Sequence, residues 1–411
     1  MGSVLVTDAS ERAALAVIRS LGKKGVKVFA ADTKSFNAGF LSKYCAFKVI
    51  YPSPVKNKNK FVKSLLHFVR NTKLNLLIPI TDFTMMPILE QKDEFEKYVK
   101  VAAPSYEIAM KAYDKFQTVN IAHKCGIPYP RTFLIDRYEA LKEITDELNY
   151  PVVIKPRMKV FWRNEKAVMI KVTPSSYAYN KMDLLSKYAS LMNKFKDVVP
   201  SDFFIIQEYV QGTGYGVEVL IDNSNVVALF MHKRLREYPI TGGASTLRVS
   251  VWNRMLAEYS VKLLREMNWQ GVAMVEFKLK EESGEANLIE VNGRFWGSLP
   301  LAINAGVDFP FLLYKLMVEG DAISAWNYKL GFVERWLIPG DLLWMFDSIF
   351  RNHEGSKFNI LRQFMTTPLL PDDIISLDDL APTIGALAEV LYHVIEISRR
   401  ERTIYGEVLS K

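Results

Sequence analysis

The sequence contains Ala273-Met-Val-Glu276-Phe-Lys-Leu279 and, eight residues later, Asn287-Leu-Ile-Glu290-Val-Asn292-Gly293-Arg294. Apolar and polar residues alternate in both stretches, which predicts two strands with one buried face each. The segment between them, Glu-Glu-Ser-Gly-Glu, is typical of a turn, so the two strands should form a hairpin. With the turn centred on Ser283, Glu276 and Glu290 face each other, because each lies seven residues from the centre.

Two facing carboxylates repel each other across a strand pair. A hard cation relieves this repulsion, and two carboxylates suit Mg²⁺ when they are joined by the amide oxygen of Asn292, which projects on the same face as Glu290. The alternative is a half-exposed hairpin whose glutamates only contact water. The hairpin alone does not decide between a metal site and a solvated surface.

Length and composition bound the class of protein. A chain of 411 residues predicts two or three domains with sizeable cores, and a hydrophobic content of 49% is typical of a soluble globular protein. Cys45 and Cys125 are the only cysteines, so the sequence has no disulfide framework and no paired-cysteine metal motif. The five histidines lack any paired spacing, which argues against zinc chemistry.

We expect a cytoplasmic protein without a transmembrane span. The sequence begins with a strand signal at Val4–Thr7 and shows no secretory signal. Its most apolar twenty-residue window, Leu299–Val318, contains Asn304, Asp308 and Pro310, which favours a packed core over a membrane helix.

Positive charge is concentrated in residues 1–112, which hold eighteen Lys and Arg against nine Asp and Glu. The interpretation we favour is a solvated basic face. The alternative is attraction of an acidic substrate or an anionic surface. Binding of nucleic acid is not expected, because no basic motif interleaved with aromatic residues is present.

Residues 1–112 alternate strand and helix signals, which predicts an open, mostly parallel, Rossmann-like sheet. The first strand–helix turn lacks GxGxxG, so we reject a dinucleotide fingerprint. Asp8, Thr81 and Asp82 follow predicted strands, where they would either hold a small polar substrate or cap helices; for each residue alone, capping is the favoured interpretation. The predicted strands are 4–7, 26–31, 47–51 and 76–80, and the predicted helices are 11–21 and 61–71.

A second, α+β unit follows a helix predicted around Tyr106–Cys125 and a loop rich in glycine and proline at 126–130. Its first strand, 151–156, places Lys155 between apolar residues and a proline, and residues 167–172 are predicted to be its partner strand. The remaining predictions are a helix at 176–193, a strand at 203–210 and, after three glycines, a strand at 217–221.

From about Lys115 to Val318 the chain resembles the ATP-grasp superfamily, especially its carbamoyl-phosphate synthetase and biotin carboxylase branch. The resemblance rests on the order and spacing of several motifs and implies three domains. Residues 1–112 would be a pre-ATP-grasp domain, 113–320 an ATP-grasp domain with a small lobe at about 127–210 and a large lobe at about 211–320, and 321–411 a mostly helical extension. The matching motifs are Asp114-Lys115, Val-Val-Ile-Lys155-Pro, Gln207-Glu208-Tyr209-Val210, Glu276 and Glu290-Val-Asn292-Gly-Arg294.

The resemblance implies a role for each matching residue. Lys115 and Lys155 would contact the phosphates of ATP. Glu208 through Val210 would form the hinge beside the adenine, and Gln207 would belong to the same nucleotide-binding set. Glu276, Glu290 and Asn292 would bind Mg²⁺ or Mn²⁺. Arg294, and also Arg248 in the 241–248 loop, would stabilise charge on the substrate. From the residues alone, Lys115 reads as an exposed helix lysine and Arg248 as an exposed loop arginine.

Two features depart from the family pattern. The loop after Lys155, Arg157-Met-Lys-Val-Phe-Trp-Arg163, has no glycine, so its positive charges would have to replace the backbone contacts of a glycine-rich phosphate loop. Tyr215 stands where an acidic residue for the ribose is expected, and Glu218 is the nearest substitute.

The resemblance therefore implies an ATP-dependent ligase that activates a small-molecule carboxylate as an acyl-phosphate and joins it to an amine. A kinase that stops at phosphoryl transfer and a non-catalytic nucleotide sensor or scaffold are the alternatives. The resemblance also leans towards a homodimer. In the last ninety residues, Trp326, Trp336 and Trp344 are expected to pack inward in a helical subdomain; a partner-binding or membrane-surface face is the less favoured interpretation.

Overall fold

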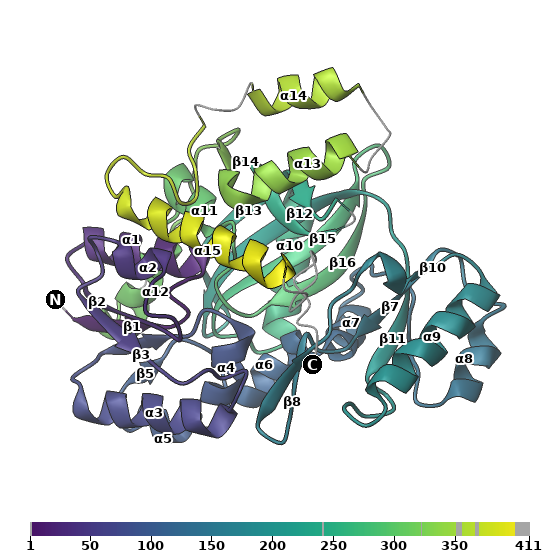
Figure 1. Ribbon diagram of the computed structural model, residues 1–411, viewed down its shortest axis with the longest axis horizontal. Helices are drawn as coiled ribbons and strands as arrows, with labels where there is room; N and C mark the ends of the chain where they lie inside the picture. Colours follow the sequence, from purple (N-terminus) through teal and green to yellow (C-terminus); the bar gives the residue numbers. More distant parts are fainter. Residues whose placement is uncertain (1, 241, 322, 351–355, 366–369, 399–411) are drawn as a thin grey trace.

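The computed structural model describes residues 2–240, 242–321, 323–350, 356–365 and 370–398 (Figure 1). Residues 1–112 form the predicted open sheet, in which the strands run in the order β3-β2-β1-β4-β5 and every pair is parallel. Its strands are β1 (Ser3–Val6), β2 (Lys27–Asp32), β3 (Phe47–Ile50), β4 (Leu76–Ile78) and β5 (Lys100–Val101). Its helices are α1 (Arg12–Lys23), α2 (Ala38–Leu41), α3 (Lys58–Asn71), α4 (Asp82–Leu89) and α5 (Lys92–Glu96).

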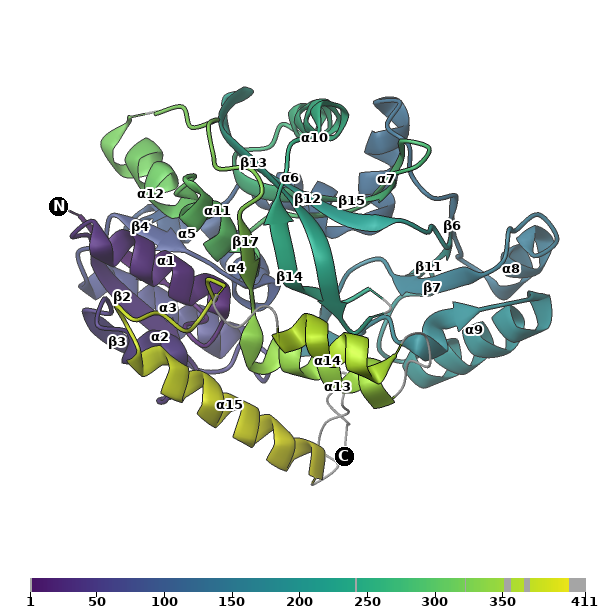
Figure 2. The ribbon, with the colours of Figure 1, turned by 90° about the horizontal axis from the view of Figure 1, so that it is seen from above.

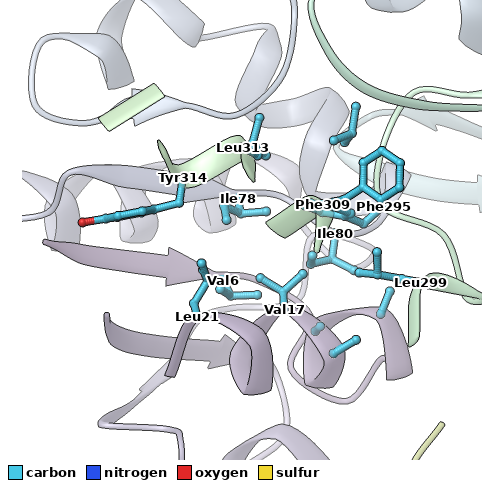
Figure 3. Packing of buried hydrophobic residues seen from close by; sticks show 14 of the residues in the cluster. Val6, Val17, Leu21, Ile78, Ile80, Phe295, Leu299, Phe309, Leu313 and Tyr314 are labelled. Carbon is cyan, nitrogen blue, oxygen red and sulfur yellow. The ribbon is translucent and has the colours of Figure 1, made fainter. Parts of the chain in front are cut away.

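The core of this first sheet is completed by residues from much later in the chain. Val17 and Leu21 of α1 share one buried cluster with Phe295, Leu299 and Phe309 (Figure 3). The same cluster includes buried residues of the large sheet, so burial of apolar surface joins the first sheet to it. The division of the chain at residues 112 and 320 stays a prediction. The later helices are α11 (Leu299–Ala305) and α12 (Phe309–Tyr314), followed by a π-helical turn at Lys315–Glu319.

The single helix predicted around 106–125 is wrong. The chain forms α6 (Tyr106–Tyr113) and α7 (Lys115–Lys124), which meet at Asp114. Asp114 has an extended backbone conformation, and its side chain accepts a hydrogen bond from Phe116 N at 3.0 Å, so it ends one helix and caps the next. The break places Lys115 at the first position of α7.

A second sheet, in the order β10-β7-β11-β6, carries Lys155 on its strand β7. The predicted pairing of 167–172 with this strand is wrong. Those residues belong to a separate hairpin of β8 and β9, because Asn164 and Glu165 both have positive φ and form a two-residue turn that returns the chain directly onto β8. The elements of this region are β6 (Thr132–Leu134), α8 (Tyr138–Ile144), β7 (Val152–Pro156), β8 (Val160–Arg163), β9 (Lys166–Met169), β10 (Tyr177–Ala178), α9 (Lys181–Phe195) and β11 (Phe204–Glu208).

The large sheet has the order β16-β15-β12-β13-β14-β17 and neighbouring strands are antiparallel. Helix α10 and helix α7 cover one face through a buried cluster that includes Val217, Leu264 and Trp269. The other face carries the polar residues of the candidate site. The elements are β12 (Thr213–Asp222), β13 (Asn225–Tyr238), β14 (Ala244–Ser250), α10 (Arg254–Glu266), β15 (Gly271–Lys280), β16 (Glu285–Asn292) and β17 (Val333–Arg335).

The C-terminal region contributes strand β17 to the large sheet as well as helices, and α15 packs against α2 (Figure 2). The expectation that its tryptophans pack inward is wrong for Trp326, which is 46% exposed. Trp336 and Trp344 are half-buried and each lies under an arginine, at 3.8 Å from Arg12 and 4.2 Å from Arg236. The helices are α13 (Leu342–Phe350), which follows a π-helical turn at Leu337–Asp341, α14 (Lys357–Met365) and α15 (Ala381–Ser398).

Among the described residues, no single helix has both the length and the apolar character needed to cross a membrane. Within the described part of the chain, one pair of helices, Leu299–Ala305 and Phe309–Glu319, would together be long and apolar enough, judged by length and composition alone. The two helices are bent by 90° relative to each other, and both contribute to the buried core.

Candidate active site

Glu276 and Glu290 are paired across β15 and β16, as predicted, but the predicted turn centre is wrong. The ladder runs regularly from Lys280 and Glu285 at the turn to Phe277 and Leu288, and it then shifts by one residue. Without this bulge at Ile289, Glu276 would face the isoleucine and Glu290 would not join it. The bulge therefore places both carboxylates side by side on the polar face of the sheet.

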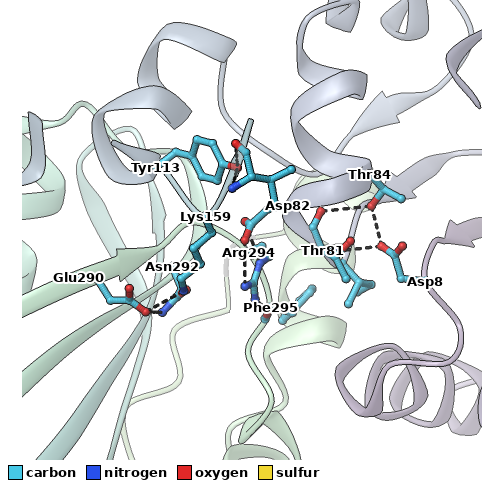
Figure 4. A network of polar contacts seen from close by, with 12 residues as sticks. Asp8, Thr81, Asp82, Thr84, Tyr113, Lys159, Glu290, Asn292, Arg294 and Phe295 are labelled. Carbon is cyan, nitrogen blue, oxygen red and sulfur yellow. Dashed lines mark hydrogen bonds and ion pairs between the residues drawn. The ribbon is translucent and has the colours of Figure 1, made fainter. Parts of the chain in front are cut away.

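Asn292 joins the two carboxylates, and we refer to Glu276, Glu290 and Asn292 as the oxygen triad. The Asn292 amide Nδ2 donates to Glu276 Oε1 at 2.9 Å. It also donates to Glu290 Oε1 at 3.3 Å (Figure 4). Lys159 Nζ lies 2.9 Å from Glu290 Oε1 and 3.3 Å from Asn292 Oδ1. Burial raises the pKa of Glu290, but Lys159 and Lys115 outweigh it and hold this pKa well below its usual range.

The other carboxylate of the triad is neutralised by an arginine from two strands away. Arg234 NH2 on β13 lies 2.5 Å from Glu276 Oε2 on β15. The arginine stem crosses β12 over Gly214, where a Cβ atom would come within 2.8 Å of Arg234 Cδ. A glycine at this point of the strand is therefore needed for the arginine to reach the triad.

Arg294 links the triad to the first sheet. Its guanidinium forms a two-point ion pair with Asp82, with Nε 3.0 Å from Oδ1 and NH2 3.2 Å from Oδ2 (Figure 4). Burial raises the pKa of Asp82, but the charges of Arg294 and Lys159 and the hydrogen bond from Arg294 together outweigh it, so this pKa lies below its usual value. The structure thus places Arg294 beside the oxygen triad, as the sequence predicted.

The interpretation of Asp8 and Asp82 as helix caps is wrong. Asp82 is the first residue of α4 and binds Arg294 instead of the helix N-terminus. Asp8 accepts hydrogen bonds from Thr84 Oγ1 at 2.6 Å and from Thr81 N at 3.0 Å, and so ties the end of β1 to the chain beyond β4 (Figure 4). Both carboxylates lie at the carboxyl ends of the parallel strands, where the ligands of such sheets bind.

The two predicted phosphate-binding lysines both point towards the triad region. Lys155 Nζ donates to Gln207 Oε1 at 2.6 Å, and burial together with the positive charge of Lys115 lowers the pKa of Lys155 to about 8. Lys115 Nζ lies 3.8 Å from Glu290 Oε2, and its side chain is only 13% exposed. The alternative of an exposed helix lysine is therefore wrong for Lys115. Burial lowers its pKa, although Glu290 opposes the shift.

The predicted hinge, Glu208 to Val210, and the preceding Gln207 lie where the second sheet connects to the large sheet. Gln207 is buried and its amide donates to Thr132 Oγ1 at 2.9 Å, so its side chain orients Lys155. Glu208 accepts from Asn149 N at 3.0 Å, and Tyr209 is 44% exposed. Strand pairing ends at Glu208 and β12 begins at Thr213, so residues 209–212, which include Tyr209 and Val210, connect the two sheets.

Two predicted site residues are instead buried in the scaffold. Arg248 is fully buried and forms an ion pair with Asp373 of the C-terminal region, so it is not available as a substrate clamp. Glu218 is also fully buried, and its carboxylate lies 2.6 Å from His232 Nδ1, so it does not replace the missing ribose contact. Tyr215 projects to the opposite face, where its hydroxyl donates to Glu281 Oε1 at 2.9 Å. Local sequence could not show these partners, because they come from distant strands and segments.

Sequence reasoning missed Arg234 and the role of Asp82, and it assigned Lys159 only to the loop after Lys155. Arg234 carries no sequence signal, since it reaches Glu276 only through the order of the strands. Together with predicted residues, Asp82 and Lys159 enclose a recess of about 20 Å³. The recess is lined by Asp82, Met85, Ala109, Ala112, Tyr113, Lys115, Lys159, Glu290, Val291, Asn292 and Gly293.

Residues 201–336 match the family described as ATP-grasp in the biosynthetic pathway with Ter operon. The chain is 25% identical over 245 residues to the carbamoyl phosphate synthase large chain, N-terminal section, of Methanopyrus kandleri. That alignment covers 57% of this chain but only 39% of the relative, so the chain spans about two fifths of that protein.

Two solved structures have a similar fold. An L-amino acid ligase from Bacillus licheniformis aligns with a TM-score of 0.60 and 12% identity, and the alignment covers 78% of this chain and 74% of the ligase. The biotin carboxylase of Campylobacter jejuni, in its β,γ-ATP complex, aligns with a TM-score of 0.63 and 18% identity, over 81% of this chain and 74% of the carboxylase. Glu276, Glu290 and Asn292 lie on the large sheet, Lys155 lies on β7 and Lys115 lies on α7. The part of the chain that matches the ATP-grasp family, residues 201–336, includes the carboxylate pair, Asn292 and Arg294.

Proposed function

We propose that the protein is an ATP-dependent ligase that activates a small-molecule carboxylate as an acyl-phosphate and joins it to an amine, forming a C–N bond. One observation carries the proposal: Glu290 and Asn292 of the oxygen triad line one recess together with Lys115 and Lys159. Glu276 is hydrogen-bonded to Asn292, and Arg294 and Lys155 both lie within electrostatic range of Glu290. Such a set of groups can bind the phosphates of a nucleotide and stabilise charge at a carboxylate.

The oxygen triad fits Mg²⁺ or Mn²⁺. It offers two carboxylates and an amide oxygen, which are hard ligands of the kind these ions prefer, and it is balanced in the structure by the cations Lys159 and Arg234. A divalent ion bound there would bridge the triad to nucleotide phosphates and neutralise their charge.

The protein's own groups would carry out the remaining tasks. Lys155 and Lys115 would bind phosphate oxygens, and Gln207 would hold Lys155 in place. Arg294, fixed by Asp82, would stabilise negative charge on the substrate carboxylate and on the tetrahedral species. The part of the chain that encloses the site therefore acts mainly by positioning and electrostatics.

The reaction would proceed in two balanced steps. A carboxylate oxygen attacks the γ-phosphorus of ATP, the bond to the β-phosphate bridging oxygen breaks, and ADP leaves. The nitrogen of a neutral amine then attacks the acyl carbon, phosphate leaves with the C–O electron pair, and the nitrogen releases one proton to solvent. The products are an amide, ADP and phosphate.

The proposed ligase activity agrees with the names of similar proteins, which include a carbamoyl phosphate synthase and an L-amino acid ligase. Because the chain spans 39% of the first of these, its own activity, its carboxylate and amine substrates, a homodimeric state and a cytoplasmic location are all part of the proposal.

The experiment that tests the proposal is measurement of ADP release with Mg-ATP and pooled carboxylic acids, with and without pooled amines that include amino acids. We expect ADP only when an acid and an amine are both present, and none with the Glu290→Gln variant. A stable phosphorylated acid formed without an amine would replace the ligase by a kinase. Tight ATP binding without ADP release under all conditions would indicate a sensor or scaffold.

A further inference from the structure

The β8–β9 hairpin, residues 157–169, rests on the first domain. At its turn, Glu165 accepts hydrogen bonds from Lys58 N through its carbonyl oxygen and from Asn59 N through its carboxylate, both at 2.9 Å. Ala167 N donates to Val55 O at 2.9 Å, and Trp162 Nε1 donates to Pro54 O at 3.3 Å. The loop at residues 54–59 therefore holds the tip of the hairpin.

The base of the hairpin is held equally firmly. Arg157 forms ion pairs with Asp114 and with Asp202, each at 2.5 Å. Val160 N donates to the Tyr113 hydroxyl at 3.0 Å. Lys159 lies between these two anchors, so its backbone position is set by contacts on either side of it.

The Lys159 ammonium occupies the position of a cation at the oxygen triad. It bonds to Glu290 Oε1 and Asn292 Oδ1, which are the oxygen atoms that a metal ion would need. Its side chain is 42% exposed, so it can change rotamer and leave the triad without unfolding the core. The recess beneath it has about 20 Å³, which is room for about one water molecule and far too little for a triphosphate.

We propose that Lys159 is an exchangeable cation of this site: it neutralises the oxygen triad in the nucleotide-free protein and moves to the nucleotide phosphates when a divalent ion takes the triad. This inference rests on the proposed function. The β8–β9 hairpin is then a lid that carries a charge, where a glycine-rich loop would instead offer backbone N–H groups.

The chemistry of lysine suits this exchange. Its ammonium is a compact charge on a flexible stem, so it can pair with a carboxylate or a phosphate without fixed geometry. Fully ionised ATP bound to one divalent ion brings a net charge of about −2, which attracts the displaced ammonium towards the phosphates. Lys159 then pairs with the oxygen triad in the nucleotide-free protein and with the phosphates in the nucleotide-bound protein.

The first test is metal binding without nucleotide, in which Mn²⁺ is titrated into the full chain and followed by electron paramagnetic resonance. Lys159→Met removes the competing charge but keeps the length of the side chain, so we expect it to bind Mn²⁺ about three- to fivefold more tightly than the parent. The matched control is Lys166→Met on the exposed side of the same hairpin, for which we expect the parent affinity. Equal or weaker Mn²⁺ binding by Lys159→Met would overturn the inference.

The second test is calorimetric titration with adenylyl-imidodiphosphate and Mg²⁺. We expect Lys159→Met to bind adenylyl-imidodiphosphate about tenfold more weakly than the parent and to lose less affinity for ADP. The control, Lys166→Met, should keep the parent affinity for both nucleotides. A hairpin that is merely misfolded would weaken both metal and nucleotide binding. Tighter Mn²⁺ binding together with weaker nucleotide binding therefore separates exchange from structural damage. Nucleotide affinity equal to that of the parent would also overturn the exchange. If the parent itself fails to bind the analogue, the proposed function fails, whereas the Mn²⁺ titration still decides whether Lys159 occupies the triad.

Discussion

Glu276 and Glu290 face each other across β15 and β16 because one residue of β16, Ile289, bulges out of the ladder between them. Each carboxylate is then neutralised from a different direction, Glu276 by Arg234 of β13 and Glu290 by Lys159 of the β8–β9 hairpin. The triad therefore depends on three parts of the chain that are far apart in sequence, and the effects of substitutions can be predicted from these contacts.

Glu290→Gln is expected to abolish metal-dependent turnover and to weaken Mn²⁺ binding strongly, because one charged ligand is lost. The same change leaves Lys159 and Lys115 without their carboxylate, so the free energy of unfolding without metal should fall by about 1–3 kcal/mol. Urea unfolding and ADP release measure the two effects.

The matched control for this variant is Glu285→Gln at the far end of the same strand, where the side chain is 53% exposed and pairs with Lys280. It should change the unfolding free energy by less than about 0.5 kcal/mol. Unchanged ADP production by Glu290→Gln would contradict the assignment of the metal ligands.

Lys155 should make nucleotide binding dependent on pH. Since its pKa is about 8 in the nucleotide-free protein, the ammonium is largely present at pH 7 and largely absent at pH 9. We expect the affinity for adenylyl-imidodiphosphate to fall by up to about tenfold between these values, because phosphate binds the charged form. Lys155→Met should bind weakly at both pH values, and a pH profile identical to that of the parent would exclude this role.

The same lowered pKa predicts an effect on stability in the absence of nucleotide. Between pH 8 and about pH 10.4 the unfolded chain holds a proton on Lys155 that the folded chain has lost. The unfolded state binds more protons in this window, so Lys155 makes the unfolding free energy rise with pH there. Parallel urea titrations of the parent and Lys155→Met at pH 8 and pH 10 isolate this contribution, which should be missing in the variant.

Arg248 and Arg294 should respond oppositely to the same substitution. Arg248→Met removes one of the two arginines that pair with Asp373, the other being Arg12, and removes the positive charge beside Glu334, which should cost about 3 kcal/mol of unfolding free energy. Arg294→Met should instead lose activity, with a smaller stability cost confined to the Asp82 pair. Thermal unfolding and ADP release distinguish them, and a stable but inactive Arg248→Met protein would restore Arg248 as a substrate-binding residue.

Gly293 is required for the close approach of Trp269 to the triad strand. A Cβ atom at this position would lie 2.3 Å from the indole Cη2, so Gly293→Ala must displace either the buried tryptophan or the backbone between Asn292 and Arg294. We expect a loss of about 1–3 kcal/mol in unfolding free energy, with weaker Mn²⁺ binding.

Gly284→Ala is the matched control, at the turn of the same hairpin. Gly284 has a φ of +73° and no atom within 4 Å of an added Cβ, so the change should cost about 1 kcal/mol through backbone strain alone. Mn²⁺ affinity should be retained in this variant. If both variants lost affinity for Mn²⁺ to the same extent, the effect would come from the hairpin as a whole and not from Gly293.

Local sequence patterns were sufficient to predict the open parallel sheet and the hairpin that pairs Glu276 with Glu290 and carries Asn292 on the same face. The site roles of Lys115, Lys155 and Arg294 were implied only by the resemblance to a known family. Alternation of apolar and polar residues indicates which face of a strand is buried, and a lysine or glutamate in such a pattern is visible without knowledge of its partner. The break at Asp114 was missed because both flanking segments have helical periodicity.

The sequence by itself thus determined four strands of the first sheet, strands β7, β11 and β12 and the β15–β16 hairpin, and which of their residues carry charge. Only the tertiary structure decided that Glu218 and Arg248 are buried with His232 and Asp373, that Arg234 crosses Gly214 to Glu276, and that Lys159 lies on the triad. The physical reason is that electrostatic partners are set by strand order and by the docking of hairpins and C-terminal segments, which bring together residues from 14 to 131 positions apart.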